Sequence, residues 1–208
     1  MPRGKWQEER AEIRGQAEAK RRSGKDRSSH DAKRGEKVPT LQSLSGQMPT
    51  EAEILGFIGI TLKESDRGAA IMAAALVEMS LEMAIRAKLV DPGQEITKSW
   101  FSGTNAPFGT FSAKIKLGRA LAIYANEMDS RLGAIKDIRN TFAHRNLPLD
   151  LENEAAIEAC NKMAPFMKRA TFKDNYRMVF VTGCVTHAHS LLKFAMKHGG
   201  KTMIPDFL

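Results

Sequence analysis

Residues 66–90, DRGAAIMAAALVEMSLEMAIRAKLV, form a long stretch of the chain in which apolar residues leave few polar positions. Alanine, leucine and methionine are the commonest residues in it, and they lose little side-chain freedom when they enter a helix. A helix that is apolar on nearly every side is usually buried at the centre of a domain. The stretch therefore predicts a central core helix on which the other elements pack.

Three charged residues interrupt this core helix, and they share one stripe. Glu78, Glu82 and Arg86 follow one another at intervals of four residues, which places them on the same side of a helix. One interpretation is an ion pair within the helix, along a partly exposed edge. The other is that Glu78 or Glu82 reaches across to a basic residue in a polar site. The sequence leaves both interpretations open.

Shorter helices are predicted on both sides of the core helix from capping residues, apolar spacing and Pro or Gly stops. We expect helices at about residues 51–64, 110–126, 129–145, 153–163 and 174–198. The expected N-caps are Thr50, Thr110 or Ser112, Asp129 or Ser130, and Asn153. Residues 91–109 are expected to form a loop with one short turn near Trp100. No strand-type alternation of useful length is present, so the predicted fold is all-α, a single bundle of about five to seven helices.

Residues 1–37 differ in composition from the rest of the chain. They carry twelve Lys and Arg residues against seven Asp and Glu residues, so they hold +5 of the total net charge of +8. A segment with almost no large apolar residues cannot bury enough surface to offset its chain entropy. We therefore expect a basic disordered tail and linker over residues 1–49, followed by an all-α domain over residues 50–208.

The tail has one functional interpretation. Lys20, Arg21 and Arg22 are consecutive cations of the kind that hold the phosphates of RNA or DNA without reading the base sequence. The alternative is a solvated tail with no dedicated ligand, because the interspersed acidic residues dilute its charge.

Composition also indicates the cellular compartment of the protein and whether it forms disulfides. The two cysteines, Cys160 and Cys184, are too few for a disulfide framework and are expected to be small buried hydrophobes in a reducing compartment. No apolar run approaches the roughly 20 residues of a membrane span, and the charged N-terminus has no apolar signal-peptide stretch. We expect a cytoplasmic protein that does not contact a membrane.

The polar residues Asn140 and His144 occur in a segment whose apolar spacing predicts a helix. At about 100° per residue, Ile138 and Phe142 lie on the side that faces the core, and Arg139 lies at its margin. Asn140 and His144 point to the opposite side. These two polar side chains therefore need either solvent or a partner surface.

The spacing Arg139-Asn140-x-x-x-His144 resembles the Arg-(four to six residues)-His motif of the HEPN superfamily of helical proteins. A wider part of the chain, about residues 54–198, looks like the mannitol operon repressor family. This resemblance rests on a Gly/Pro loop, the helix start that follows it, and the motif helix. The matching segments are Phe101-x-Gly103, Ala106-Pro107-Phe108-Gly109, Phe111-Ser112-Ala113-Lys114-Ile115, Leu117, Ala120-Leu121 and Ile138-Arg139-Asn140-x-Phe142-Ala143-His144.

Resemblance to the mannitol operon repressor family implies an all-α fold, often dimeric, that takes part in regulating the transcription of sugar operons. The sequence contains no convincing helix-turn-helix, so direct reading of a DNA groove is not expected. The first hypothesis is therefore a helical regulatory protein, as a homodimer, that acts by binding a protein or nucleic-acid partner.

Resemblance to the HEPN superfamily implies a second hypothesis, a metal-independent endoribonuclease. In such an enzyme Arg139 would hold the scissile phosphate, and His144 would act as general base or acid toward the 2′-hydroxyl. Asn140 would orient the histidine or the phosphate, and two subunits would bring their Arg/His pairs into one cleft. The purely structural alternative is that Asn140 and His144 form hydrogen bonds across a dimer interface or to the loop before Gly109.

Cys184, His187 and His189 resemble metal ligands in composition, but their geometry does not favour a metal. On a helix the two histidines diverge by about 200°, so they cannot share one ion. No metal or cofactor is therefore expected.

Lys114 belongs to a basic edge that includes Lys116 and Arg119 and follows the Gly109 loop. One interpretation is that Lys114 contributes to nucleic-acid binding as an extension of a phosphate site. The alternative is an ordinary solvated face of a helix.

Overall fold

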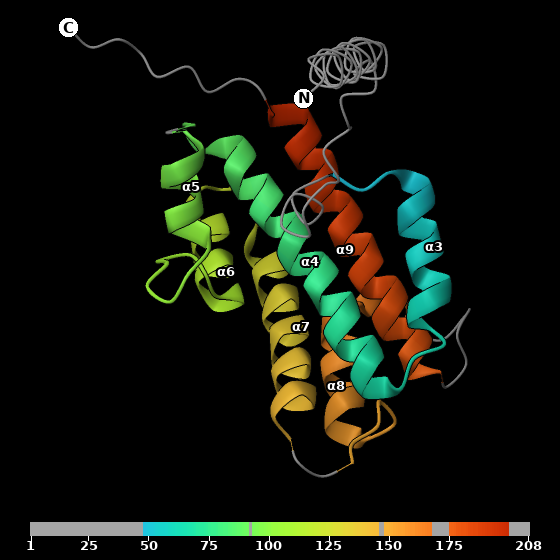
Figure 1. Cartoon of the computed structure of the whole chain (residues 1–208). Helices are drawn as coiled ribbons and strands as arrows, with labels where there is room; N and C mark the ends of the chain where they lie inside the picture. Colours follow the sequence, from blue (N-terminus) through green and yellow to red (C-terminus); the bar gives the residue numbers. More distant parts are fainter. Residues whose placement is uncertain (1–47, 92, 146–147, 168–174, 200–208) are drawn as a thin grey trace, which may run out of the picture. The chain divides into compact units, whose positions relative to one another are not determined.

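The computed structural model describes residues 48–91, 93–145, 148–167 and 175–199, and every regular element within them is a helix (Figure 1). The predicted all-α class is therefore confirmed. The elements in chain order are α3 (Glu51–Thr61), α4 (Asp66–Lys88), α5 (Gln94–Phe101), α6 (Phe111–Ala120), α7 (Asn126–His144), α8 (Glu154–Met163), the short 3₁₀ turn Pro165–Met167, and α9 (Tyr176–His198). Residues 1–47 of the predicted tail and linker, which include Lys20, Arg21 and Arg22, lie outside the described residues.

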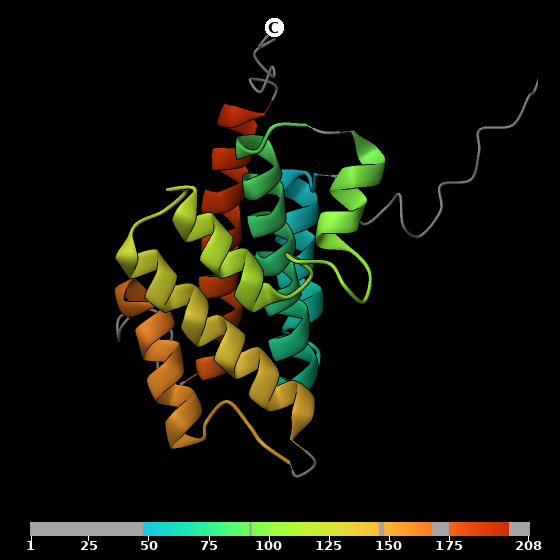
Figure 2. The same ribbon diagram turned by 90° about the vertical axis from the view of Figure 1, so that its left-hand side faces the viewer.

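Two 23-residue helices, α4 and α9, lie side by side and form the centre of the bundle (Figures 1 and 2). Alanine recurs along the buried side of α4, and small side chains let two helices approach closely. Helices α6 and α7 pack against α4 on one side, while α3 packs against α4 and α9 on the other. Helix α8 completes the bundle by packing between α7 and α9.

Helix α4 is the predicted core helix. Its buried residues are Ala69, Ala70, Ala73, Ala74, Leu76, Val77, Ser80, Leu81, Ala84 and Ile85. By length and composition alone α4 would also qualify as a membrane span. Half of its most apolar 18-residue stretch, however, is buried inside the bundle. Its apolar surface therefore has protein partners among the described residues.

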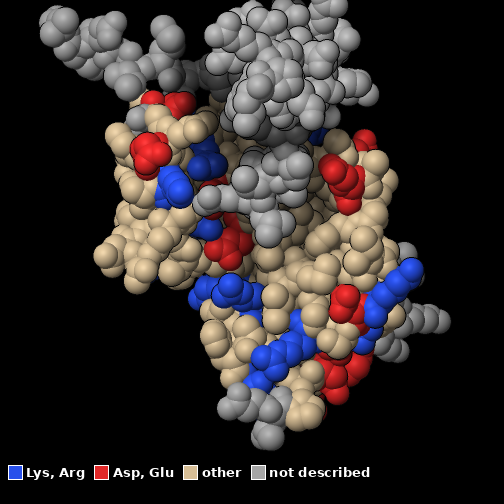
Figure 3. All heavy atoms as spheres, in the orientation of Figure 1, with Lys and Arg blue, Asp and Glu red and all other residues tan. Residues whose placement is uncertain are grey.

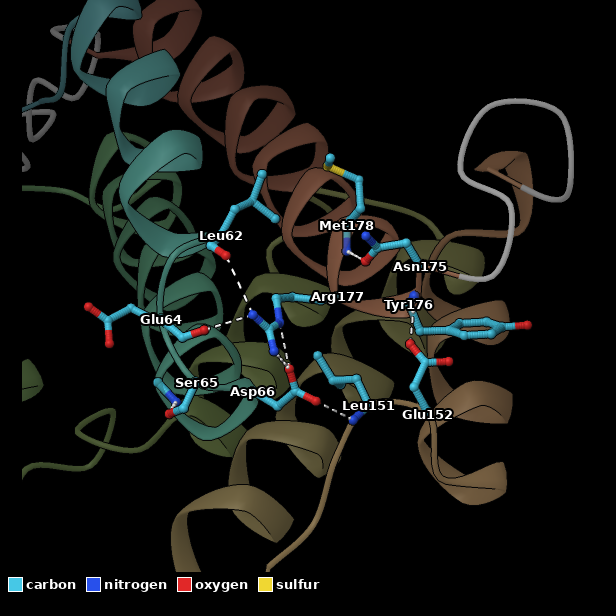
Figure 4. Close-up of polar contacts among 11 residues, drawn as sticks. Leu62, Glu64, Ser65, Asp66, Leu151, Glu152, Asn175, Tyr176, Arg177 and Met178 are labelled. Atoms are coloured by element: carbon cyan, nitrogen blue, oxygen red, sulfur yellow. Dashed lines mark hydrogen bonds and ion pairs between the residues drawn. The ribbon is translucent and has the colours of Figure 1, made fainter.

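One carboxylate joins three segments at the end of the bundle where α4 and α9 begin (Figure 4). One Asp66 oxygen accepts hydrogen bonds from the Arg177 guanidinium of α9, and the other accepts the Leu151 backbone N–H at 2.8 Å. Arg177 also donates to the backbone carbonyl of Glu64 at 2.9 Å, in the turn between α3 and α4. Asp66 and Arg177 thus fix the relative positions of α4, α9 and the segment before α8.

The predicted caps at Thr50, Thr110 and Asn153 are confirmed. Thr50 and Glu53 form both hydrogen bonds of a capping box, and the Thr110 and Asn153 side chains each accept a backbone N–H of the helix that follows. Helix α3 ends at Thr61, three residues earlier than expected. The stretch predicted as a loop contains the two-turn helix α5, which buries Phe101.

The boundary between α6 and α7 differs from the prediction because Tyr124 folds back onto α6. Its hydroxyl donates to the Ile115 carbonyl at 2.6 Å, and its ring lies over Gly118. The chain reverses at Ala122, whose φ is 53°, so α6 ends at Ala120 rather than near 126. Helix α7 then begins at Asn126, without a side-chain cap and three residues before Asp129.

Candidate functional site

Helix α7 positions the motif residues as its apolar spacing predicted. Ile138 and Phe142 are buried in the core, at 4% and 3% exposure. Asn140 is half-buried and His144 is exposed in the last turn. The two polar side chains therefore lie on the solvent side of α7, where a partner can reach them.

Arg139 and Asn140 form one unit on α7. The half-buried Arg139 donates from Nη1 to Oδ1 of Asn140 at 2.9 Å. Asn140 therefore orients the guanidinium, whereas no hydrogen bond connects Asn140 to His144 within the described part of the chain. Because the Asn140 amide is neutral, this hydrogen bond does not neutralise the guanidinium. The positive charge of Arg139 is therefore available to an anionic ligand.

Arg67, in the first turn of α4, also lies near the motif residues of α7, and the sequence did not predict this. Its Nη2 donates to the backbone carbonyl of Ala143 at 2.8 Å, although 76 residues separate the two. Ala143 directly precedes His144, so Arg67 lies at the end of α7 that carries the motif. The sequence did contain one signal of Arg67. A cation in the first turn of a helix interacts unfavourably with the helix dipole, so Arg67 was an unusual residue at this position.

The surface around the last turns of α7 is cationic. Within the described ranges, Arg67, Arg139 and Arg145 take part in no ion pair, and the nearby carboxylate of Asp137 pairs with Lys136 at 3.0 Å. Figure 3 shows Lys and Arg atoms in the lower half of the view, where Figure 1 places the second half of α7, with Asp and Glu atoms to the right of them. We call Arg67, Arg139, Asn140, His144 and Arg145 the α7 end surface.

Lys114 does not lie on an exposed basic edge. Its side chain is only 8% exposed, and its Nζ is 3.0 Å from carboxylate oxygens of both Glu78 and Glu82. The two glutamates thus reach across to a basic residue on α6, and Glu82 also pairs with Arg86 within α4 at 3.6 Å. The Lys114 ammonium is buried and paired with two carboxylates, so its position does not support the predicted role in nucleic-acid binding.

The side chains of His187 and His189 diverge on α9, in agreement with the geometric argument against a shared metal ion. His187 is buried, and its Nε2 lies 2.9 Å from the Met163 carbonyl, whereas His189 is exposed. Burial lowers the pKa of His187, and the hydrogen bond to Met163 partly opposes this effect. Cys184 and Cys160 are buried free thiols. Among the described residues no three His, Cys, Asp or Glu side chains form a metal-binding group.

Comparison with protein families, curated proteins and solved structures gave no match to this chain.

Proposed function

We propose that this chain is a helical regulatory protein, of the mannitol operon repressor type, that acts by binding through its α7 end surface. The main support is the cationic character of that surface. Arg139 is held by a neutral amide, and the neighbouring Arg67 is held by a backbone carbonyl, so neither is neutralised by a carboxylate. This arrangement favours a polyanion as the partner, and hence a nucleic acid over a neutral protein surface.

The proposed binding unit is a homodimer in the cytoplasm. Two copies would double the number of phosphate contacts and thereby raise the overall affinity without any new type of contact. Light scattering on the purified full chain should give twice the mass of one chain. A monomer at micromolar concentration would contradict this part of the proposal.

The basic tail is proposed as a second, sequence-independent contact with RNA or DNA through Lys20, Arg21 and Arg22. Deletion of residues 1–37 should leave thermal stability nearly unchanged and make nucleic-acid binding less dependent on salt. A large loss of thermal stability would show that the ordered domain begins before residue 50.

The alternative function is a metal-independent endoribonuclease of the HEPN type. Its specific support is the position of the motif side chains: His144 is exposed, and the half-buried Arg139 is held in place by Asn140. Arg139 would stabilise the charge that develops on the phosphate. His144 would move a proton at the 2′-hydroxyl or at the leaving oxygen. Because Asn140 binds Arg139, its role would be to orient the phosphate-binding group rather than the histidine.

Incubation of the full chain with mixed single-stranded RNA in EDTA separates the two functions. The binding proposal expects intact RNA that is retained by the wild type and released by Arg139→Gln. Cleavage that is lost in His144→Ala but kept in His189→Ala would overturn the binding-only proposal and support the nuclease. His189 is a suitable control because it is an exposed histidine on α9. Intact RNA under all conditions, with folded variants, would overturn the nuclease.

A further inference from the structure

Arg67 reaches the α7 end surface from a different part of the chain. It is exposed at the start of α4, and its Nη2 donates to the Ala143 carbonyl at 2.8 Å. A guanidinium has five N–H groups, and one of them suffices for this hydrogen bond. The others remain able to bind a ligand, because no carboxylate among the described residues pairs with Arg67.

The contact brings Arg67 to the part of α7 that carries Arg139. Ala143 follows Arg139 by four residues, so the two backbone positions lie on one stripe of α7, about 6 Å apart along the helix axis. Neither arginine takes part in an ion pair among the described residues. A nucleic-acid strand that binds at this end of α7 therefore meets two cations from different parts of the chain.

The backbone carbonyl also fixes Arg67 before any ligand arrives. A long exposed side chain loses rotamer freedom when it binds a ligand, and this loss weakens binding. The carbonyl of Ala143, at the negative end of the α7 dipole, attracts a cation and restrains the side chain in advance. The planar guanidinium can keep this contact while it binds a phosphate, which a lysine ammonium does with less directional control.

We propose that Arg67 is a phosphate-binding residue of the α7 end surface and that, with Arg139, it contacts the phosphate backbone of single-stranded nucleic acid. This inference rests on the proposed binding function. The alternative is that Arg67 only caps the C-terminal end of α7. The capping role requires the hydrogen bond alone, whereas the phosphate role also requires the positive charge.

The test measures binding of the full chain to fluorescein-labelled oligo(U) and oligo(dT) of 15 nucleotides, in EDTA, over a series of salt concentrations. The variants are Arg67→Gln, which retains an N–H donor without the charge, Arg67→Lys, which retains the charge, and Arg139→Gln. Lys193→Gln is the matched control. Lys193 is exposed in the second half of α9, whereas Arg67 lies in the first turn of α4, at the end of the bundle where α9 begins.

The expected result is weaker binding by Arg67→Gln, about threefold to tenfold at 50 mM salt, with a salt slope smaller by about 0.7 on both oligonucleotides. Arg67→Lys should keep the wild-type salt slope, and Lys193→Gln should match the wild type. If Arg139→Gln weakens binding while a folded Arg67→Gln matches the wild type, the phosphate role of Arg67 is wrong and the proposed function stands. A loss on oligo(U) alone would also overturn it, because both strands carry the same phosphates. If the wild type binds neither oligonucleotide, the proposed function fails and this inference fails with it.

Discussion

The guanidinium of Arg177 binds the carboxylate of Asp66, which joins the first turn of α9 to the first turn of α4. The side chain of Asp66 is 14% exposed, and its second oxygen accepts the Leu151 backbone N–H. Removal of the carboxylate therefore leaves a cation and a backbone donor without their acceptor. Such losses in partly buried positions are costly because the remaining polar groups stay desolvated.

We predict that Asp66→Ala lowers the free energy of unfolding by about 2–4 kcal/mol. Asp66→Asn should lower it by less, since its amide oxygen can still accept one of the hydrogen bonds. Urea denaturation followed by circular dichroism gives both values. Glu158→Gln, at an exposed position of α8, is the control and should change stability by less than about 0.5 kcal/mol. An Asp66→Ala variant as stable as this control would show that the contact contributes little.

The ion cluster around Lys114 gives a second prediction. Lys114→Ala leaves Glu78 and Glu82 as neighbouring, partly buried carboxylates, and we expect it to cost about 2–4 kcal/mol of stability. Replacing Lys114 and both glutamates, as Lys114→Met with Glu78→Gln and Glu82→Gln, should recover most of this loss because no buried unpaired charge remains. Arg86 loses its Glu82 partner, but its side chain is 42% exposed and stays hydrated. Denaturation curves of the single and triple variants measure the difference. If the triple variant is no more stable than Lys114→Ala, the unpaired carboxylates are not the cause of the loss.

His187 makes stability depend on pH in a defined direction. Burial lowers its pKa in the folded protein below the ordinary value of 6.5, so the unfolded chain takes up a proton more readily than the folded one. Its contribution to stability is complete above about pH 6.5 and decreases as the pH falls from there toward the lower folded-state pKa.

We predict that His187→Gln reduces the loss of stability between pH 7 and pH 5, because glutamine does not titrate and its amide can donate to the Met163 carbonyl. Thermal unfolding at a series of pH values measures this slope. His189→Gln changes an exposed histidine of the same helix and should leave the slope as in the wild type. If the thermal stability of His187→Gln depends on pH as strongly as that of the wild type, His187 is not the source of this pH dependence.

Two glycines in helices should respond to alanine with opposite signs. A Cβ at Gly118 would lie 2.9 Å from Cε1 of Tyr124 and 3.0 Å from Cδ1 of Leu81, which is closer than such atoms pack. At Gly133 of α7 a Cβ would meet nothing within 4 Å. We predict that Gly118→Ala destabilises by about 1–3 kcal/mol through overpacking. Gly133→Ala should stabilise by about 0.5–1 kcal/mol through helix propensity. Stabilisation by both substitutions, seen as raised midpoints in thermal unfolding, would disprove the close contact of Tyr124 with Gly118.

The features that the sequence predicted correctly depend on interactions between residues that are close together in the chain. The core helix over α4 and the caps at Thr50, Thr110 and Asn153 follow from local propensity and local hydrogen bonds. The outward direction of Asn140 followed from helical periodicity alone. These inferences hold because the interactions behind them span four residues or fewer.

The features that were not predicted depend on contacts between distant parts of the chain. The end of α6 is set by Tyr124, which folds back to bond Ile115, and no local pattern encodes that return. The pairing of Lys114 with Glu78 crosses 36 residues, so the glutamates could be recognised as unusual while their partner could not be identified. Arg67 reaches α7 across 76 residues, which is why it was absent from the predicted site.

The side-by-side packing of α4 and α9 has a consequence for the order of events during protein synthesis. Helix α4 emerges from the ribosome early, but the helix that covers most of its apolar surface begins at Tyr176. Until about a hundred further residues have been translated, this long apolar helix lacks its main partner. Segments left in this state are the ones that chaperones bind and that aggregate when translation is slow or interrupted. A nascent chain stalled before α9 should therefore be held by chaperones, and release of the full chain should end that dependence.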